Sequence, residues 1–316
     1  MSLSILLYFC ISENNFGQLI RIFPKLNLVY FVLALIAMII YWLCDSVVLF
    51  RIFRDKLISF TNFFRITMLG QFYNSITPFN SGGQPAQVMY LTKFKIQAGE
   101  AISKLAQKIF VYQICSTTVS SLSIMFFSNQ FKNKFSGFTF LTILGLAFQC
   151  SGIFLIVLFY LNKKKLMNLS LKLGNLLYKM HIIKNTKLFN QKIEKHMEFL
   201  QDENFSFDFD IWMFIYSFVQ NIAFYSVPFF IAKSFGLSSF PVFSMIAAQI
   251  FITLISSANP LPGAAGTTEG SFLLILSDFF VGHEIAPAMI LCRLISYYLN
   301  IAVGSIVVFL KKSSNI

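Results

Sequence analysis

Hydrophobic residues occupy long, nearly uninterrupted runs along the chain. Five of these runs reach the roughly 20 apolar residues that a helix needs to cross a bilayer; they span residues 27–50, 101–127, 138–161, 209–232 and 285–310. A shorter run, 3–11, lacks the basic flank and cleavage site of a signal peptide. The pattern predicts an all-α fold: a polytopic integral membrane helical bundle in which residues 1–316 form a single membrane domain.

Basic clusters fix the expected orientation of the runs. The segments "RIFRDK" (51–56), "KFK" (93–95), "NKKK" (162–165) and "KK" (311–312) are expected on the cytoplasmic side, where short loops retain Lys and Arg. The apolar stretch 58–91 lies between two of these clusters and is too short for two spans. It is therefore predicted to enter and leave the membrane on the same side, as a re-entrant hairpin with 78–85 near its tip.

The same argument from basic clusters and run lengths predicts a second re-entrant hairpin, which enters from the other side of the membrane. The run 209–232 leads outward and 285–310 leads inward, so 240–280 must begin and end outside, with 260–269 at its tip. The two tips, "NSITPFNSGG" and "SSANPLPGAAG", both place small polar residues before a proline and glycines after it. Because inverted repeats of broken helices are typical of transporters, we predict an inverted repeat with motifs at 70–91 and 258–272.

Composition excludes a soluble enzyme. Mean hydropathy is +0.70 and only 12% of residues are charged, about half the fraction of a soluble domain. The net charge of +12 does not indicate nucleic acid, because the lysines cluster in loops between apolar segments. The five cysteines and three histidines show no ligand spacing, and no nucleophile has an evident base. We therefore expect no catalytic residue, no bound metal and no cofactor.

One long polar segment, 162–204, carries nine lysines. Five apolar residues recur in it at intervals of three and four: Leu166, Leu169, Leu173, Leu176 and Met180. The pattern predicts either a cytoplasmic amphipathic helix drawn to anionic lipids of the inner leaflet or a solvated loop that only marks topology.

The first motif suggests an anion site. Gly82 and Gly83 are expected to turn the chain with positive φ and to leave their N–H groups uncovered, while Pro85 begins a helix over 84–92. The N-terminus of such a helix attracts phosphate. Neutral polar side chains surround it: Asn74, Ser75, Thr77, Asn80, Ser81, Gln84 and Gln87. The alternative is a tight turn whose amides satisfy only their own backbone.

The second motif adds charge. Glu269 follows Gly263, Gly266 and Thr267 and is the only acid between Asp210 and Asp278. An ionised carboxylate at membrane depth needs a partner, and Arg293, inside an apolar run, is the nearest candidate. We predict a buried Glu269–Arg293 pair. It could couple a proton, contact a lipid headgroup or act as a static strut.

Three segments carry a family resemblance: "GQFYNSITPFNSGGQPAQVMYL" (70–91), "PLPGAAGTTEGSF" (260–272) and "CRLISYYLNIAVG" (292–304). In this order they resemble the membrane domain of lysylphosphatidylglycerol synthase/flippase proteins, in a stand-alone, Firmicutes-type branch. The resemblance covers the chain from about residue 27 onward. It departs after the first glycine pair, where many members carry an acid and an arginine and this chain has Gln84 and Gln87.

The resemblance implies a flippase-like protein that binds or translocates an anionic or aminoacylated phospholipid. It further implies a bacterial inner membrane and names a separate soluble synthase as a candidate partner. The basic clusters described above predict that the C-terminus and 162–204 lie in the cytoplasm. One alternative is phosphatidylglycerol lysyltransferase, which we do not expect from these residues because the appended acyltransferase domain of full-length synthases is not encoded after Leu310. A small-solute or ion transporter is the second alternative.

Overall fold

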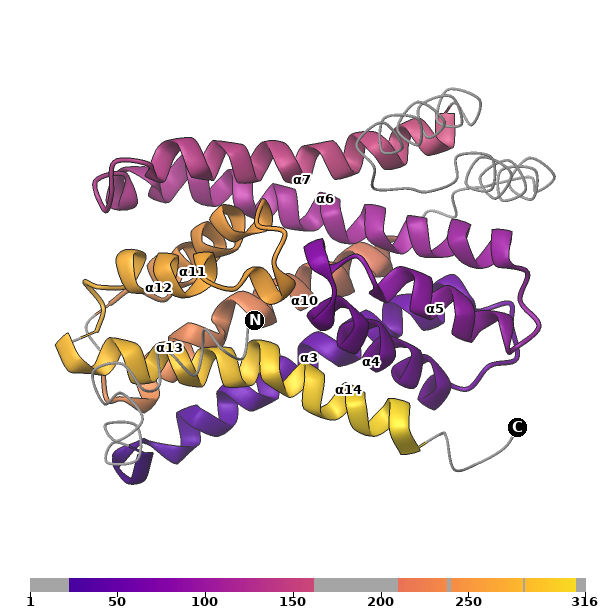
Figure 1. The fold of residues 1–316 in the computed structure, drawn as a ribbon, viewed down its shortest axis with the longest axis horizontal. Helices are drawn as coiled ribbons and strands as arrows, with labels where there is room; N and C mark the ends of the chain where they lie inside the picture. Colours follow the sequence, from indigo (N-terminus) through magenta and orange to yellow (C-terminus); the bar gives the residue numbers. More distant parts are fainter. Residues whose placement is uncertain (1–22, 162–209, 238–239, 281, 311–316) are drawn as a thin grey trace, which may run out of the picture.

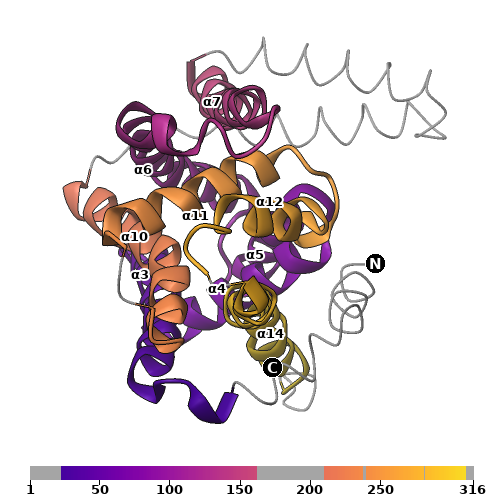
Figure 2. The same cartoon turned by 90° about the vertical axis from the view of Figure 1, so that its left-hand side faces the viewer.

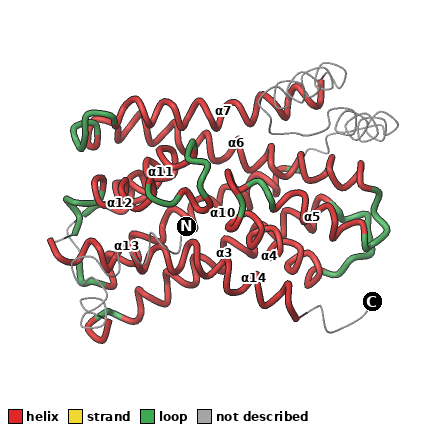
Figure 3. Tube along the Cα trace, viewed as in Figure 1, coloured by secondary structure: helices red, strands yellow, loops and turns green. Residues whose placement is uncertain are grey.

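The computed structural model describes residues 23–161, 210–237, 240–280 and 282–310, and this part of the chain contains helices and loops without any strand (Figure 1, Figure 3). The predicted features at 3–11, 162–204 and 311–312 lie outside the described residues. Five helices in the described part are long and apolar enough to cross a membrane. The chain is thus an all-helical polytopic bundle, as predicted.

The five long helices match the predicted runs to within a few residues. They are α3 (Leu28–Ile52), α6 (Ala98–Phe131), α7 (Phe138–Leu161), α10 (Ile211–Ser234) and a C-terminal helix made of α13 (Ile285–Arg293), η6 (Leu294–Tyr298) and α14 (Leu299–Leu310). The sequence predicted the last as one regular run. The structure instead inserts a π-helical turn, η6, a feature that occurs frequently at functional sites.

Helix starts are set by side-chain caps. The Asn27 Oδ1 accepts the Val29 N–H (3.1 Å) at the start of α3, and the Asp210 Oδ1 accepts the Trp212 N–H (3.0 Å) at the start of α10. Asp210 also pairs with Arg51 at 2.6 Å. Burial raises the pKa of Asp210, but the bonds from Arg51 and Trp212 outweigh it and hold that pKa below its usual value. The end of α3 is thereby fastened to the start of α10.

Two helical hairpins fill the centre of the bundle. The first joins α4 (Phe60–Ile76) to α5 (Gly83–Thr92) through η3 (Pro78–Asn80), and the second joins α11 (Val242–Ser257) to α12 (Thr267–Ile275) through η4 (Pro262–Ala264). The short turns η2 (Phe23–Lys25) and η5 (Gly282–Glu284) complete the described elements. The predicted breaks in the helices are therefore confirmed.

The two hairpins enter from opposite ends of the bundle and their tips meet midway (Figure 1). The Phe79 N–H of the first tip donates to the Pro260 carbonyl of the second at 3.3 Å. In the view along the bundle, three groups of helices surround the hairpins: α3 with α10, α6, and α14. Helix α7 lies outermost, beyond α6 (Figure 2). This is the arrangement that an inverted repeat requires. Where the hairpins sit relative to a bilayer stays a prediction.

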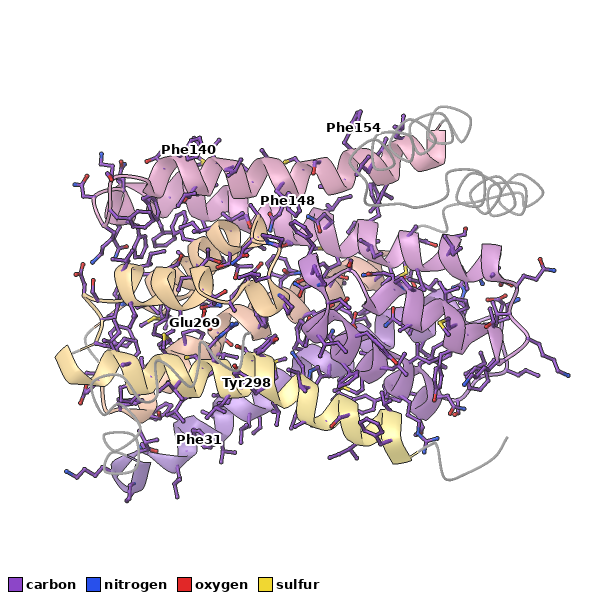
Figure 4. The ribbon with its side chains drawn as sticks, in the orientation of Figure 1. Phe31, Phe140, Phe148, Phe154, Glu269 and Tyr298 are labelled. Atoms are coloured by element: carbon purple, nitrogen blue, oxygen red, sulfur yellow. The ribbon has the colours of Figure 1, made fainter. Side chains whose placement is uncertain are left out.

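Aromatic packing closes the core around the second hairpin. Phe131, Phe138 and Phe251 are fully buried and touch one another, with ring centroids 5.0–6.5 Å apart. By contrast, α7 presents Phe140 (70% exposed) and Phe154 (64% exposed) away from the bundle (Figure 4). Exposed aromatic surface of this extent fits contact with lipid tails, so α7 forms an outer wall.

Single cysteines outside the helices test the hairpin topology. In a background without native cysteines, Leu57→Cys and Lys95→Cys flank the first hairpin, and Pro241→Cys and Asp278→Cys flank the second. We expect an impermeant maleimide to label the first two from one face of the membrane and the last two from the opposite face. Labelling of Leu57→Cys and Lys95→Cys from opposite faces would rule out a re-entrant first hairpin.

Gly145 sets the approach of α7 to α11. A Cβ at Gly145 would lie 2.0 Å from the Leu254 carbonyl oxygen, whereas a Cβ at Gly152 of the same helix meets nothing closer than 3.9 Å. We expect Gly145→Ala to destabilise the protein by about 1–3 kcal/mol, as overpacking does, seen as a lower Tm in detergent. Gly152→Ala is the matched control and should leave Tm unchanged or slightly raised. Equal Tm values for the two variants would contradict this packing.

Candidate functional site

The first tip turns at residues that the sequence did not single out. Phe79 (φ 53°) and Asn80 (φ 52°) adopt the left-handed conformation, whereas Gly82 has φ −80° and Gly83 lies inside α5. The prediction of positive φ at the two glycines is therefore wrong. The chain reverses directly after Pro78, at Phe79 and Asn80, three residues earlier than expected. Because bulky residues seldom take positive φ, the surroundings of Phe79 must enforce this conformation.

The two glycines serve close approach instead. A Cβ at Gly83 would lie 2.4 Å from the Asn74 Oδ1, and a Cβ at Gly82 would lie 2.6 Å from the Thr77 Cγ2. These side chains accept the glycine N–H groups, Thr77 from Gly82 and Asn74 from Gly83, both at 2.8 Å. The N–H groups expected to be uncovered are thus already satisfied. The sequence analysis predicted that Pro85 begins this helix. In the structure α5 begins at Gly83, so that prediction is wrong.

The two glutamines of the first motif separate. Gln87 is buried, and its Nε2 donates to the Ile66 carbonyl at 3.3 Å. A Cβ at Gly70 would lie 2.4 Å from that Nε2, so Gln87 fastens α5 to α4 away from the tip. Gln84 is half-buried, one turn nearer the tip, and Ser81 is exposed.

The second tip contains the predicted ion pair. Glu269 is fully buried and Arg293 is 7% exposed. The Glu269 Oε1 accepts from the Arg293 Nε and Nη2, each at 2.8 Å, and its Oε2 accepts the Gly266 N–H at 2.7 Å. The Arg293 Nη2 also donates to the Gly263 carbonyl at 2.9 Å. Figure 4 shows Glu269 between the second hairpin and the C-terminal helix. The predicted pair is confirmed and braces the tip from two sides.

The two tips share one backbone geometry. Gly263 (φ 63°, ψ 18°) follows Pro262 just as Phe79 (φ 53°, ψ 21°) follows Pro78, and each is followed by a second left-handed residue. The second tip continues to Gly266 at φ 89°. Similar turns in hairpins that enter from opposite ends support a repeat at the level of structure.

Tyr297 links the two motifs and was not singled out from the sequence. Its ring lies 4.7 Å from the Arg293 guanidinium carbon, and its hydroxyl donates to the Ser75 carbonyl in α4 at 2.7 Å. A Cβ at Gly263 would lie 2.3 Å from this ring, which explains a glycine there. The signal available in the sequence was a pair of tyrosines inside the apolar segment 292–304.

Asn259 braces the second tip from within. Its Nδ2 donates to the Ala265 carbonyl at 3.1 Å and to the Thr267 Oγ1 at 2.9 Å, and its Oδ1 accepts the Leu261 N–H at 2.9 Å. Gly266 and Thr267 remain exposed, as do Asn80 and Ser81 of the first tip. The meeting point of the hairpins therefore presents exposed polar groups above a buried ion pair.

A second buried ion pair escaped the sequence analysis. The Lys108 Nζ of α6 lies 2.8 Å from the Asp45 Oδ1 of α3, and the two residues are 9% and 5% exposed. The Gln71 Nε2 of α4 lies 3.4 Å from the other Asp45 oxygen and 3.2 Å from the Tyr41 hydroxyl. The signal was available, because Asp45 is the only acid in the apolar run 27–50.

Fold and site together define a polytopic membrane protein built on two broken-helix hairpins around buried ion pairs. The chain belongs to the lysylphosphatidylglycerol synthase TM region family, whose model matches residues 2–304. It is similar to a UPF0104 membrane protein of Archaeoglobus fulgidus, at 27% identity over 262 residues that cover 79% of this chain and 76% of the relative. No solved structure matches the chain. The resemblance found in the sequence is confirmed.

Charge removal at the Glu269–Arg293 pair should be strongly non-additive. We expect Glu269→Gln and Arg293→Gln each to lower stability by about 3–5 kcal/mol, because each leaves a buried charge without its partner. The double variant should regain part of that loss, measured by Tm in detergent.

The Lys134–Asp278 pair provides the control, because its acid is 72% exposed. Asp278→Asn should change stability by no more than about 1 kcal/mol. Strictly additive effects of the Glu269 and Arg293 substitutions would show that the two side chains do not stabilise each other.

Proposed function

We propose that the chain binds the headgroup of an anionic or aminoacylated phospholipid, of the phosphatidylglycerol or lysylphosphatidylglycerol kind, and moves it between leaflets. The observation that carries the proposal is the meeting of two helix breaks halfway along the bundle, with exposed polar groups over a buried ion pair. Irregular backbone at membrane depth is tolerated where it is buried in protein or lines a cavity. Exposed polar groups at that depth need a polar partner.

The chemistry of the tips suits a phospholipid headgroup. The exposed Asn80 amide can donate to phosphate oxygens. The Ser81 and Thr267 hydroxyls donate to the Pro78 and Ala264 carbonyls in the free protein, and each would have to rotate toward the phosphate to donate to it. A phosphate suits the Arg293 guanidinium, and the ammonium of an aminoacyl group suits the Glu269 carboxylate. Because Glu269 and Arg293 already satisfy each other, binding of an aminoacylated headgroup, which carries both a phosphate and an ammonium, would exchange one ion pair for two and leave neither side chain unpaired.

The wall beside the tips suits acyl chains. Phe79 of the first tip stacks on Phe148 of α7, with ring centroids 6.1 Å apart and planes 23° apart. The two side chains remain 51% and 46% exposed, and Figure 4 shows Phe148 on the side of α7 that faces the hairpins. An apolar surface next to a polar tip offers both halves of a lipid a matching environment. A transporter of small polar solutes would not require this apolar surface, because its substrate has no acyl chains.

Lipid movement is the direct test. The purified chain is reconstituted into vesicles containing trace phosphatidylglycerol with a fluorophore on an acyl chain, and an impermeant reductant quenches the outer leaflet. Wild-type protein should make inner-leaflet label accessible faster than protein-free vesicles do. The double variant Glu269→Gln, Arg293→Gln, which leaves no lone charge, should move lipid at least about tenfold more slowly. An activation free energy higher by about 1.4 kcal/mol is enough to give that factor.

Asp278→Asn is the matched control, because it removes an exposed acid at the end of the second hairpin, and it should keep the wild-type rate. A wild-type rate equal to that of empty vesicles would overturn the proposal. Movement of a free anion without movement of the labelled lipid would favour the solute-transporter alternative.

A further inference from the structure

The Asp45–Lys108 pair, together with Gln71, joins α3, α6 and α4 inside the bundle, and neither charged residue belongs to the proposed headgroup site. Asp45 lies about 10 Å before the end of α3 at Ile52, and Lys108 about 15 Å after the start of α6, at 1.5 Å per residue. Gln71 reaches the pair from α4, and Gln220 of α10 lies within hydrogen-bonding reach of Tyr41. A pair of charges at such depth costs free energy to bury and marks a functional site by default.

The surroundings of Asp45 hold phenols, thiols and one cationic side chain. Its own helix contributes Tyr41 and Cys44, α6 contributes Lys108, Tyr112 and Cys115, and α10 contributes Tyr225; α4 adds the neutral Gln71. Phenols and thiols are predominantly neutral near pH 7 in water. Among the groups that the structure places around Asp45, only Lys108 can therefore balance its charge.

A continuous chain of contacts leads from Asp45 to the headgroup site. Gln71 contacts the carboxylate, and the Gln71 carbonyl accepts the Ser75 hydroxyl at 2.8 Å. The Ser75 carbonyl accepts the Tyr297 hydroxyl, and the Tyr297 ring lies against Arg293. One helical turn of α4, from Gln71 to Ser75, thus connects the two ion pairs.

We propose that Asp45 is the proton-coupling site of the transport cycle, an inference that rests on the proposed function. A proton from one aqueous face binds the Asp45 carboxylate, converts it to the neutral acid and releases Lys108 from the pair. The bundle then holds one uncompensated positive charge in a medium of low dielectric. That charge stabilises an anionic headgroup at the tips. By linkage the headgroup raises the affinity of Asp45 for its proton, so one proton moves with one anionic lipid.

Because one proton moves with one lipid, a pH gradient should distribute the labelled lipid unequally between the two leaflets. With membrane potential clamped by potassium and an ionophore, the driving force of one pH unit equals 1.36 kcal/mol per proton. Wild-type vesicles with a gradient of about one unit should therefore hold trace labelled phosphatidylglycerol at up to about a tenfold excess in the leaflet on the alkaline side. Asp45→Asn resembles the protonated state permanently and should bring that ratio to about one while lipid still exchanges.

Two variants keep the test decisive. Asp55→Asn removes an exposed acid between α3 and α4 and should retain the wild-type asymmetry. Because Asp45→Asn leaves Lys108 buried and unpaired, the double variant Asp45→Asn, Lys108→Gln is measured beside it; this variant holds no lone charge and should also show a ratio near one.

Each outcome decides a different statement. A wild-type protein that moves lipid without asymmetry, or an Asp45→Asn variant that keeps the asymmetry, overturns the proton site and leaves the proposed function standing. A wild-type protein that moves no lipid overturns both. If neither Asp45 variant exchanges lipid, infrared difference spectra between acid and neutral pH decide. A carboxylic-acid carbonyl component that is present in the wild type and lost in the double variant supports the site, whereas wild-type and double-variant spectra that are identical in the carbonyl region overturn it.

Discussion

The carboxylate of Glu269 holds together the three parts of the molecule that meet at its centre. One oxygen accepts the Gly266 N–H of the second tip and the other receives Arg293 of the C-terminal helix. Arg293 in turn donates to the Gly263 carbonyl and lies on the ring of Tyr297, which reaches α4. Broken helices expose backbone groups that lipid cannot satisfy. A single ion pair satisfies two of them here, and the arrangement of both hairpins depends on it.

The two tips solve the same steric problem with different residues. Each reverses direction immediately after a proline through two residues in the left-handed region. The second tip uses Gly263, which the neighbouring Tyr297 ring requires to lack a side chain. The first tip places Phe79 in the same conformation at a cost of roughly 1–2 kcal/mol. The hydrogen bond to Pro260 and the stacking on Phe148 offset that cost, so the strain is maintained by contacts to the other hairpin and to α7.

Two buried ion pairs, one at the tips and one among α3, α4 and α6, place opposite charges inside the bundle. Each pair is neutral as a unit, which is why an apolar bundle can contain it. They are joined through Gln71, Ser75 and Tyr297. The proposed movement of a charged headgroup would use both pairs, because each can supply a counter-charge inside an apolar bundle.

The sequence by itself determined the five long helices, the two breaks and the Glu269–Arg293 pair. Length and hydropathy fix spans because a bilayer has a set thickness, and isolated opposite charges in apolar runs have few possible partners. The tertiary structure alone decided which residues turn at each tip. Gly82 and Gly83 met the general rule for positive φ, yet the packing of Asn74 and Thr77 against them placed the turn at Phe79 and Asn80. It also decided that the first helix N-terminus is capped from within, that Gln87 is structural, and that Asp45 meets Lys108. These depend on contacts between residues distant in the chain, which a linear pattern of hydrophobic and polar positions does not contain.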